Sequence, residues 1–591
     1  MNYYPPHIEI SSESSILFGS IIHKNNQYLF DNNIIENNRA IHNDIVYIQD
    51  NKVINIKQRN ITKIAGILYL NKNTKYGFNS KNMPYYVFKP LNKKYPKFLV
   101  ASSIKNTSKN YIVISFNKWP TDSKYPYGKC EKIIGPIGNY ENECEILLYK
   151  HNLVFPKFKI HKSDIIQHQQ FNSNLQAYDY NVFSIDPPCC KDIDDAISVH
   201  SYPDYIEIGV HITDVSYYIN DLQHLLTNLP TSVYCLHKQI NMIPDIYATD
   251  ICSLLENTYR KCVSVIYRFS HNYELLDFDI KLTNVYVMKN LSYDDAELYI
   301  KKNNKNTNKN TNKNTNKNTN KDYSYLSDLW NFITKYDSSI TDTHILIEKL
   351  MVLTNHKIAD TLYNYDKENT ILRTHNNTNV IDGVRGVIGV NDISCEKNNK
   401  LNDKKLQEFL KLKTYQAATY EKNVDTPCHY GLDLHLYTHF TSPIRRLSDI
   451  ITHINIKKYL EDEPLLEIQE NEINHINNVN KSTKKLGFDY KIIELLYKFK
   501  TDTMYKCEAY IIDFNKDKLK IYIPEFNIEY KIKYYNDSLV NLYTILEADD
   551  YLEIIYENEK KKYKKMEKIN IEMYFVKDSD ILEDKIKIKF I

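Results

Sequence analysis

The stretch Ser184-Ile-Asp-Pro-Pro-Cys-Cys-Lys-Asp-Ile-Asp-Asp-Ala-Ile197 decides how the rest of the chain is interpreted. Its acidic residues are closely spaced: Asp186, Asp192, Asp194 and Asp195. Val182 to Ile185 has the composition of a short buried strand, and the following proline pair breaks it because proline has a fixed φ and no amide donor. A new alternating run begins at Asp195, so the aspartates are expected on a loop between two strands.

Acidic side chains crowded into one loop repel one another unless a cation neutralises them. Carboxylate oxygens are hard ligands that suit Mg²⁺ or Mn²⁺, and Mg²⁺ usually binds through a few carboxylates together with phosphate oxygens of a substrate. The spacing therefore predicts a site for Mg²⁺, or for Mn²⁺, on this loop. The alternative for the spacing alone is an acidic turn solvated by water.

A second stretch, Tyr437-Thr-His-Phe-Thr-Ser-Pro-Ile-Arg-Arg446, has a complementary chemistry. Ser442 is a favoured helix N-cap and the proline after it suits the first helical position, so a helix is expected to begin there. Arg445 and Arg446 would then lie in the first turn, where cations are unfavourable unless an anion such as phosphate shares the site. The alternative is an ion pair between Arg445 and Asp449, worth about 0.3–0.5 kcal/mol. Carboxylates for a metal and arginines for a phosphate together indicate phosphodiester chemistry.

The aspartate stretch resembles the signature of the RNase II/RNase R (RNB) family of exoribonucleases. Further runs resemble the same family in the same order, namely Gly209-Val-His-Ile-Thr-Asp-Val-Ser216, Thr231-Ser-Val-Tyr234, Leu291-Ser-Tyr-Asp-Asp-Ala-Glu297 and Leu346-Ile-Glu-Lys-Leu-Met351. Such an ordered set is very hard to obtain by chance. The resemblance covers most of the chain and is strongest to the eukaryotic exosome-type members. Those members often carry an endonuclease domain ahead of their first barrel, and this activity is not expected here.

The resemblance implies a processive, Mg²⁺-dependent 3′→5′ exoribonuclease that hydrolyses single-stranded RNA to nucleoside 5′-monophosphates. Asp186, Asp192 and Asp195 would hold one or two Mg²⁺, which can activate the attacking water and stabilise the leaving oxygen. Asp194 would help to orient that water or the second metal.

The same resemblance implies roles for residues outside the aspartate loop. Arg445 and Arg446 would stabilise the charge that develops on the scissile phosphate. Tyr234 is similar to the family residue that stacks on the 3′-terminal base. Tyr293 is similar to the residue near the ribose that favours RNA over DNA through the 2′-hydroxyl.

Two other functions are compatible with parts of this pattern. The first is a catalytically silent family member that serves as an RNA-binding scaffold. Silent relatives tend to lose acidic residues of the signature, whereas this chain keeps all four. The second is a DNA nuclease or another metal-dependent phosphotransferase, which the ordered set of runs disfavours.

Composition restricts the class of protein. With 591 residues the chain is multidomain, and its net charge of +2 excludes a uniformly basic surface, so any RNA-binding surface must be a local patch or channel. The cysteines form no C-x-x-C pair, which favours reduced thiols in an intracellular protein. No signal peptide or run of about 20 apolar residues is present. We therefore expect a soluble monomer of the cytoplasm or nucleus that binds single-stranded RNA and no membrane; the sequence does not identify its protein partners.

The fold class expected is a multidomain α+β protein in which a mixed α/β RNB catalytic domain is flanked by small OB-type β-barrels. Short alternating strands and Asn-rich turns predict small β-barrels at residues 1–55 and 56–150, and the resemblance implies that both are cold-shock-like. The catalytic domain is expected at 165–480, with an Asn-Thr-Asn-Lys repeat at 303–321 that has no apolar residue and is predicted to be a disordered insertion. A third OB-type, RNA-binding barrel is expected at 505–591.

Three local predictions concern the catalytic domain. The run from Tyr205 to Ile212 alternates and should form a hairpin with the strand after Asp195. Thr343 to Asp360 should be an amphipathic helix, on which Glu348 and Asn355 share a face. The resemblance favours RNA-binding roles for both residues, and the alternative is a solvated helix face. At Phe488-Asp489, where bacterial relatives carry a glutamate after an alanine, no role is assigned.

Overall fold

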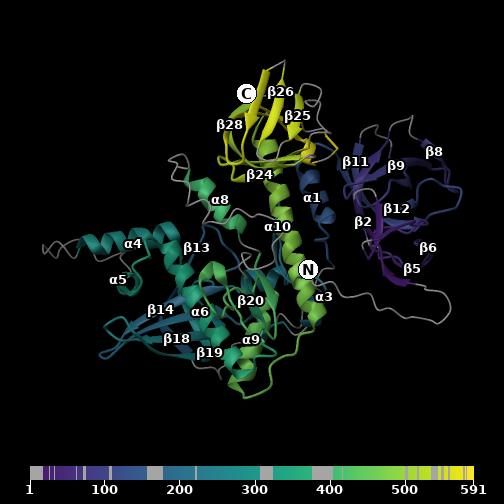
Figure 1. Ribbon diagram of the computed structural model, residues 1–591. Helices are drawn as coiled ribbons and strands as arrows, with labels where there is room; N and C mark the ends of the chain where they lie inside the picture. Colours follow the sequence, from purple (N-terminus) through teal and green to yellow (C-terminus); the bar gives the residue numbers. More distant parts are fainter. Residues whose placement is uncertain are drawn as a thin grey trace.

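The computed structural model shows two small β bodies, a large mixed α/β body and a third β body at the C-terminal end (Figure 1). It describes residues 17–590 except 25–26, 32, 61–62, 71–74, 105–108, 156–176, 220–221, 307–323, 376–402, 415–416, 500–503, 516–517, 534–542, 548–550, 557–558, 577–578 and 581. Most of the repeat predicted as a disordered insertion lies outside these residues, although helix α4 (Tyr293–Asn306) includes its first part. No helix in the described part is long and apolar enough to cross a membrane.

The first two bodies are built from short strands, as the alternating pattern predicts. The first has two three-stranded sheets, made of β1 (Leu17–Ser20), β5 (Ile45–Gln49) and β6 (Lys52–Gln58), and of β2 (Ile22–Lys24), β3 (Gln27–Phe30) and β4 (Asn33–Ile35). The boundary expected at residue 55 falls inside β6, because Val46 of β5 pairs with Ile56 and Ile45 pairs with Gln58.

The second body is one six-stranded sheet that pairs back on itself through β9 and β10. Its strands are β7 (Ile64–Tyr69), β8 (Lys75–Phe78), β9 (Pro84–Pro90), β10 (Phe98–Ala101), β11 (Lys109–Lys118) and β12 (Tyr127–Pro136). Helix α1 (Tyr140–Lys150) follows, capped by the side chain of Asn139. Both bodies carry their own apolar clusters, so each has a core of its own.

A closed five-stranded barrel lies at the centre of the large body. Its strands are β13 (Ala177–Asp186), β14 (Asp195–Ser201), β15 (Ile206–Thr213), β18 (Thr258–Phe269) and β19 (Leu275–Ser292). β14 and β15 form the predicted antiparallel hairpin, and the parallel pairing of β13 with β19 closes the ring. This mixed architecture with barrels confirms the predicted fold class.

Strand β15 of the barrel is buried on both of its faces. Ile208, Val210 and Ile212 point outward into an apolar core shared with helices α5 (Ser324–Tyr336) and α6 (Thr343–Tyr365). On the opposite face His211 is fully buried, and its ring nitrogens lie 2.9 Å from Ser198 Oγ and 2.7 Å from Ser264 Oγ. Burial lowers the pKa of His211 to about 3, so this ring is a neutral hydrogen-bonding group inside the barrel.

Helices and short strands cover one side of this barrel (Figure 1). They include α3 (Leu222–Thr227), the hairpin of β16 (Val233–Tyr234) and β17 (Gln239–Ile240), the pair of β20 (Leu372–Thr374) and β21 (Thr419–Glu421), α9 (Leu447–Leu460) and α10 (Glu470–Lys498). Helix α8 (Lys404–Thr414) packs instead on the C-terminal body, where Leu406 is buried with Tyr510 and Tyr522. Figure 1 shows the long helix α10 extending from the large body to the C-terminal body.

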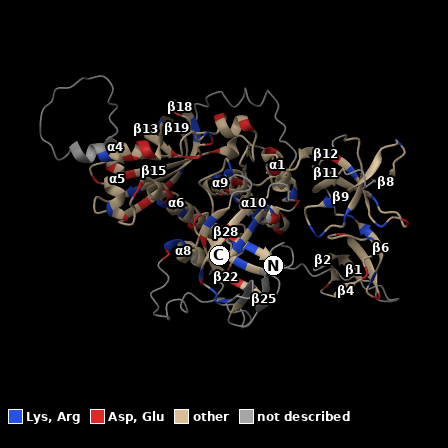
Figure 2. Cartoon of the chain, turned by 90° about the horizontal axis from the view of Figure 1, so that it is seen from above, with Lys and Arg blue, Asp and Glu red and all other residues tan. Residues whose placement is uncertain are grey.

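The C-terminal body contains a five-stranded and a three-stranded sheet. The first is formed by β22 (Tyr505–Asn515), β23 (Lys518–Ile523), β24 (Ile528–Lys533), β28 (Lys568–Phe575) and β29 (Ile586–Phe590), and the second by β25 (Tyr543–Glu547), β26 (Leu552–Tyr556) and β27 (Glu559–Tyr563). Its apolar cluster includes residues of α1 and α10, so this body shares its core with those helices. Figure 2 shows that acidic and basic residues are distributed over all the bodies.

Candidate active site

The aspartate loop connects two strands at one rim of the closed barrel. Asp186 is the last residue of β13 and Asp195 is the first residue of β14, as the sequence predicts. Asp186 is also paired with Ser292, the last residue of β19. Cys189, at the tip of the loop, has a φ of 65°, a conformation that costs non-glycine residues energy. The rim therefore brings the ends of three strands and the loop together.

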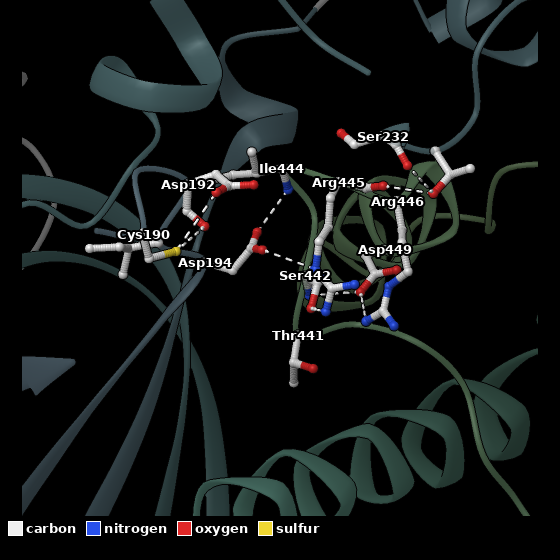
Figure 3. Close-up of polar contacts among 12 residues, drawn as sticks. Cys190, Asp192, Asp194, Ser232, Thr441, Ser442, Ile444, Arg445, Arg446 and Asp449 are labelled. Atoms are coloured by element: carbon white, nitrogen blue, oxygen red, sulfur yellow. Dashed lines mark hydrogen bonds and ion pairs between the residues drawn. The ribbon is translucent and has the colours of Figure 1, made fainter. Parts of the chain in front are cut away.

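Asp194 joins this loop to the arginine stretch (Figure 3). Its side chain is buried, and Oδ1 accepts a hydrogen bond from the backbone N–H of Ile444 at 2.8 Å. Oδ2 lies 3.7 Å from Nε of Arg445. Burial raises the pKa of Asp194 to about 7 against the opposing effects of Arg445 and the Ile444 N–H. The two predicted motifs, about 250 residues apart in sequence, thus meet at one carboxylate.

Asp192 faces the β16–β17 hairpin. Its Oδ2 accepts hydrogen bonds from the hydroxyl of Tyr234 at 2.9 Å and from Nε2 of Gln239 at 3.0 Å. Tyr234 is 52% exposed, so its ring remains accessible while its hydroxyl is held by the loop. Gln239 carries no motif in the sequence; the signal that points to it is its position opposite Tyr234 in a short hairpin.

Asp186 and Asp195 influence each other electrostatically. Burial, opposed by a hydrogen bond from Ser184 and reinforced by the charge of Asp192, raises the pKa of Asp186 to about 6. Burial and then the charges of Asp186 and Asp194 raise the pKa of Asp195 well above its usual value. Oδ2 of Asp186 is buried and has no hydrogen-bond donor among the described residues.

The carboxylates of Asp186, Asp192 and Asp195 therefore fit a hard divalent cation. Such a cation would relieve the repulsion between them and would be coordinated by Oδ2 of Asp186. The coordination shell is not prearranged: across the described residues, no group of three His, Cys, Asp or Glu side chains is positioned to hold one ion. Asp192 and Asp194 are each engaged with protein donors from other segments.

The arginine stretch differs from its prediction. Helix α9 begins at Leu447, and Ser442 to Arg445 form a turn before it, so Ser442 is not the N-cap and the arginines are not in the first helical turn. Arg446 is instead paired with Thr231 in an isolated β-bridge, and the Ser232 N–H donates to the Arg445 carbonyl. These contacts with a distant segment hold the backbone extended at Arg446, which is incompatible with a helix starting earlier.

The two arginines have different partners. The Arg445–Asp449 ion pair, which was the alternative to a phosphate-binding role, is not formed; Arg446 donates to Asp449 at 2.8 Å instead. Asp449 is fully buried and also accepts the Ser442 N–H, so it holds the turn together. The Arg446 side chain is 19% exposed, whereas that of Arg445 is 42% exposed beside Asp194. Of the two, Arg445 is therefore the one whose charge can reach a bound phosphate.

The remaining predicted residues are not all gathered at this rim. Tyr293 is close to it, because it directly follows Ser292, the last residue of β19, which pairs with Asp186. Its ring stacks on His344 with centroids 3.6 Å apart, and burial and then the charges of Asp195 and Asp186 raise its pKa to about 12. Asn355 is buried; it donates to Tyr437 and Thr441 and accepts the Phe440 N–H at 2.8 Å.

Glu348 and Asn355, which are predicted to share a face of α6, differ in burial and in partners, and their contact with RNA stays a prediction. Asn355 uses its amide to support the arginine stretch, and Glu348 is exposed on α6. They differ because the segment around Phe440 covers α6 at Asn355, whereas Glu348 lies about two turns earlier in the helix.

Comparison with known protein families agrees with this architecture. Residues 175–462 match the RNB domain, and residues 85–152 match the Dis3-like cold-shock domain 2 (CSD2). Among curated proteins, the exosome complex exonuclease RRP44 of Mus musculus is 25% identical over 543 residues, which cover 81% of this chain and 55% of the mouse protein. The chain thus spans about half the length of that relative.

Two solved structures have a similar fold. Mycoplasma genitalium RNase R in complex with ribose-methylated single-stranded RNA has a TM-score of 0.69 and 16% identity, covering 97% of this chain and 100% of its own. Yeast Ssd1, described as a pseudonuclease, has a TM-score of 0.60 and 16% identity, covering 92% of this chain and 82% of its own. These two structures show that the fold is shared. The two matched domains, together with the ordered motifs, show that the chain belongs to the RNB family.

Proposed function

We propose that this protein is a Mg²⁺-dependent, processive 3′→5′ exoribonuclease that hydrolyses single-stranded RNA to nucleoside 5′-monophosphates. The observation that carries the proposal is the junction at Asp194, where the carboxylate loop and the arginine turn meet. A phosphodiester at this junction would face hard oxygen ligands on one side and a guanidinium on the other.

The residues of the site divide the work as follows. Asp186, Asp192 and Asp195 would hold the cation, with Asp194 beside them. When bound, that cation supplies the Lewis acidity that activates water for in-line attack on the phosphate. Asp194 orients the attacking water, and Arg445 neutralises the charge that grows on the phosphate oxygens.

The substrate end of the strand is recognised by side chains next to the carboxylates. The exposed ring of Tyr234 stacks on the 3′-terminal base, while its hydroxyl stays fixed to Asp192. Tyr293, stacked on His344, lies by the ribose and distinguishes RNA from DNA through the 2′-hydroxyl. Asn355 and Asp449 maintain the shape of the arginine turn.

The test is to incubate a single-stranded RNA and the matching DNA with the protein and Mg²⁺, and to identify products by chromatography. The expected result is nucleoside 5′-monophosphates from RNA alone, with no products when EDTA replaces Mg²⁺. Release of internal fragments, or equal degradation of DNA, would contradict the proposal.

A second candidate is a silent RNB protein that binds RNA without cleaving it. The similarity to the pseudonuclease Ssd1 favours it, whereas the presence of all four aspartates disfavours it. The same incubation separates the two, because a silent protein would retain RNA on a filter and yield no mononucleotides at any Mg²⁺ or Mn²⁺ concentration.

A further inference from the structure

Arg373 lies beside the arginine turn but belongs to a different segment. It is the middle residue of β20, opposite Tyr420 of β21, and its backbone N–H donates to the Tyr437 carbonyl at 2.7 Å. Its guanidinium carbon lies 4.5 Å from the centroid of the Tyr420 ring. A guanidinium held over an aromatic ring keeps its N–H edges available for planar, bidentate acceptors.

Tyr420 is a rigid support for this guanidinium. The side chain of Asn477 on α10 accepts its backbone N–H and donates to its carbonyl, both at 2.9 Å. The Tyr420 hydroxyl lies 2.6 Å from Nδ1 of His439 and 2.8 Å from Oγ of Ser448. With both its backbone and its hydroxyl fixed, Tyr420 holds Arg373 in place before any ligand binds.

The carboxylates nearby are already used. Asp449 accepts from Arg446, Ser442 and Ser448, and Asp194 accepts from the Ile444 N–H beside Arg445. Within the described ranges no carboxylate forms an ion pair with Arg373, and no acceptor receives a hydrogen bond from its guanidinium.

Positive charge surrounds Arg373 instead. Burial lowers the pKa of Arg373, and the charge of Arg446 lowers it further. Burial and the charge of Arg373 likewise lower the pKa of Lys484 on α10. The pKa of His439 is lowered well below its usual value by burial and then by Arg446, Arg373 and Arg445. Arg446 and Lys484 are the cations whose charges couple to the half-buried Arg373, and no described carboxylate is paired with it, so a phosphate anion would be stabilised at this position.

We propose that Arg373, held over Tyr420, binds a non-scissile phosphate of the RNA strand. This subsite rests on the proposed function, because RNA is the substrate assigned there. A phosphate matches the fork of a guanidinium and supplies the missing negative charge. Arg445, whose Nε lies 3.7 Å from Asp194 Oδ2, is assigned to the scissile phosphate, and Arg373 is assigned to another linkage of the same strand.

The first experiment measures RNA binding in EDTA, so that cleavage does not interfere. Arg373→Gln should raise the Kd about tenfold, the effect of losing one charge-assisted hydrogen-bonding group. The slope of log Kd against log salt should flatten by about 0.7, the value for one phosphate contact on a single strand. Arg373→Lys should keep the slope and lose only part of the affinity.

The matched control is Arg268→Gln. Arg268 is paired with Asp277 and Asp279 and lies opposite Glu207, near the other end of the barrel from Asp195. The Kd of Arg268→Gln for RNA and the slope of its log Kd against log salt should equal those of the wild type. Thermal unfolding of all variants should show a common Tm.

The second experiment locates the phosphate with oligonucleotides that carry a neutral methylphosphonate at one linkage at a time. In the wild type, a methylphosphonate at one non-scissile linkage should weaken RNA binding about tenfold. In Arg373→Gln, a methylphosphonate at the same linkage should weaken binding no further. Equal losses in both proteins at every position would overturn the subsite while leaving the exoribonuclease intact. Failure of the wild type to bind RNA at all would instead overturn the proposed function.

Discussion

At the scale of single residues, substitution of Asp194 should separate the cleavage of RNA from the binding of RNA. In Asp194→Asn the amide oxygen of the new side chain could still accept the Ile444 N–H, so the arginine turn should keep its shape. In the proposed mechanism, the substitution removes the negative charge that would orient the attacking water. We expect kcat to fall by several orders of magnitude while the Kd for RNA stays near that of the wild type. Single-turnover kinetics with a filter-binding Kd checks this, and near-normal turnover would remove Asp194 from the mechanism.

Arg445 and Arg446 should give different phenotypes. Arg445→Ala removes a partly exposed cation beside Asp194, so kcat and kcat/KM should fall together with little change in stability. Arg446→Ala leaves the buried carboxylate of Asp449 without its cation, and the free energy of unfolding should fall by roughly 3 kcal/mol. Urea unfolding and steady-state kinetics on both variants distinguish the two roles. An Arg446→Ala protein as stable as the wild type would mean that Asp449 does not depend on this pair.

The residues of this site were predictable from sequence to different degrees. The aspartates and arginines were predicted because clustered carboxylates indicate metal binding and adjacent arginines indicate phosphate binding. The start of α9 was predicted wrongly. Ser442 has the residue type of an N-cap, but hydrogen bonds from Thr231 and Ser232, more than 200 residues earlier, hold the following backbone extended, so the helix begins at Leu447. Asp449 was considered as a partner of Arg445, yet the turn before α9 presents Arg446 to it instead. Contacts between distant segments leave no local pattern in the sequence.

At the scale of elements, the hairpin of β14 and β15 was predicted and its surroundings were not. The alternation of Ile208, Val210 and Ile212 indicates one buried face. The other face carries Glu207 and His211, and in a strand with one solvent-facing side these polar side chains would be exposed; here they are buried. They are buried because β13 pairs with β19, whose partner residues lie about 100 positions later in the chain. The closure of a barrel is a property of the whole sheet, so strand periodicity does not reveal it.

Helices α1 and α10 are joined by Asp489, the residue to which the sequence assigned no role. Its Oδ2 accepts from Lys150 Nζ at 2.8 Å and from His151 Nε2 at 2.7 Å. Burial alone would raise the pKa of Asp489, but the hydrogen bonds and charges of His151 and Lys150 outweigh it and lower the pKa below its usual value. A carboxyl with a lowered folded-state pKa stabilises the protein above its unfolded-state pKa, and this contribution is lost as the pH falls through the folded-state value.

Asp489→Asn should therefore reduce the free energy of unfolding at neutral pH, by about 1–3 kcal/mol for a charged hydrogen-bonded group. The difference from the wild type should shrink as the pH falls below about 4, the usual pKa of aspartate. Urea unfolding across this pH range measures it. The matched control is Asp425→Asn, an exposed partner of Lys367, which should leave stability unchanged. A difference that is constant with pH would mean that Asp489 acts through packing rather than charge.

At the scale of the whole molecule, the C-terminal body and the helices form one unit rather than separate modules. Its core includes Leu147 of α1 and Ile493 of α10, so a fragment that ended near Lys500 would expose this apolar surface. Lys585 Nζ lies 2.8 Å from Oε1 of Glu143, and both side chains are almost fully buried. Sequence patterns placed a barrel at residues 505–591, but they did not reveal that it completes the core of α10.

The variant Lys585→Met tests how far the Lys585–Glu143 ion pair holds the C-terminal body to helix α1. It leaves Glu143 buried with only the Tyr111 hydroxyl and the Gly138 N–H as donors among the described residues. The free energy of unfolding should fall by roughly 3–5 kcal/mol, the cost of breaking a buried ion pair. The double variant Glu143→Gln/Lys585→Met, which removes both charges, should recover most of that loss when urea unfolding is compared. A single variant as stable as the wild type would show that the C-terminal body is held by its apolar contacts alone.

The first β body is the part of the molecule that can be removed with least disturbance. Its core, which includes Ile21, Val46 and Val53, is separate from that of the second body. Its contacts with the second body include a hydrogen bond from Arg39 to the Thr121 carbonyl and the guanidinium of Arg59 over the Phe116 ring at 4.2 Å. A chain beginning at Lys63 should therefore fold and keep every residue of the candidate site.

If OB-type barrels bind single strands through aromatic stacking and phosphate contacts, this shortened chain should bind RNA more weakly. For each phosphate that the first body binds, its removal should flatten the slope of log Kd against log salt by about 0.7, whereas kcat on a short RNA should be unchanged because no part of the site is removed. Binding titrations at several salt concentrations and saturating kinetics on one oligonucleotide give both quantities. A shortened protein that folds and binds RNA with the full salt slope, yet no longer cleaves it, would show that the first body contributes to the bond-breaking step itself.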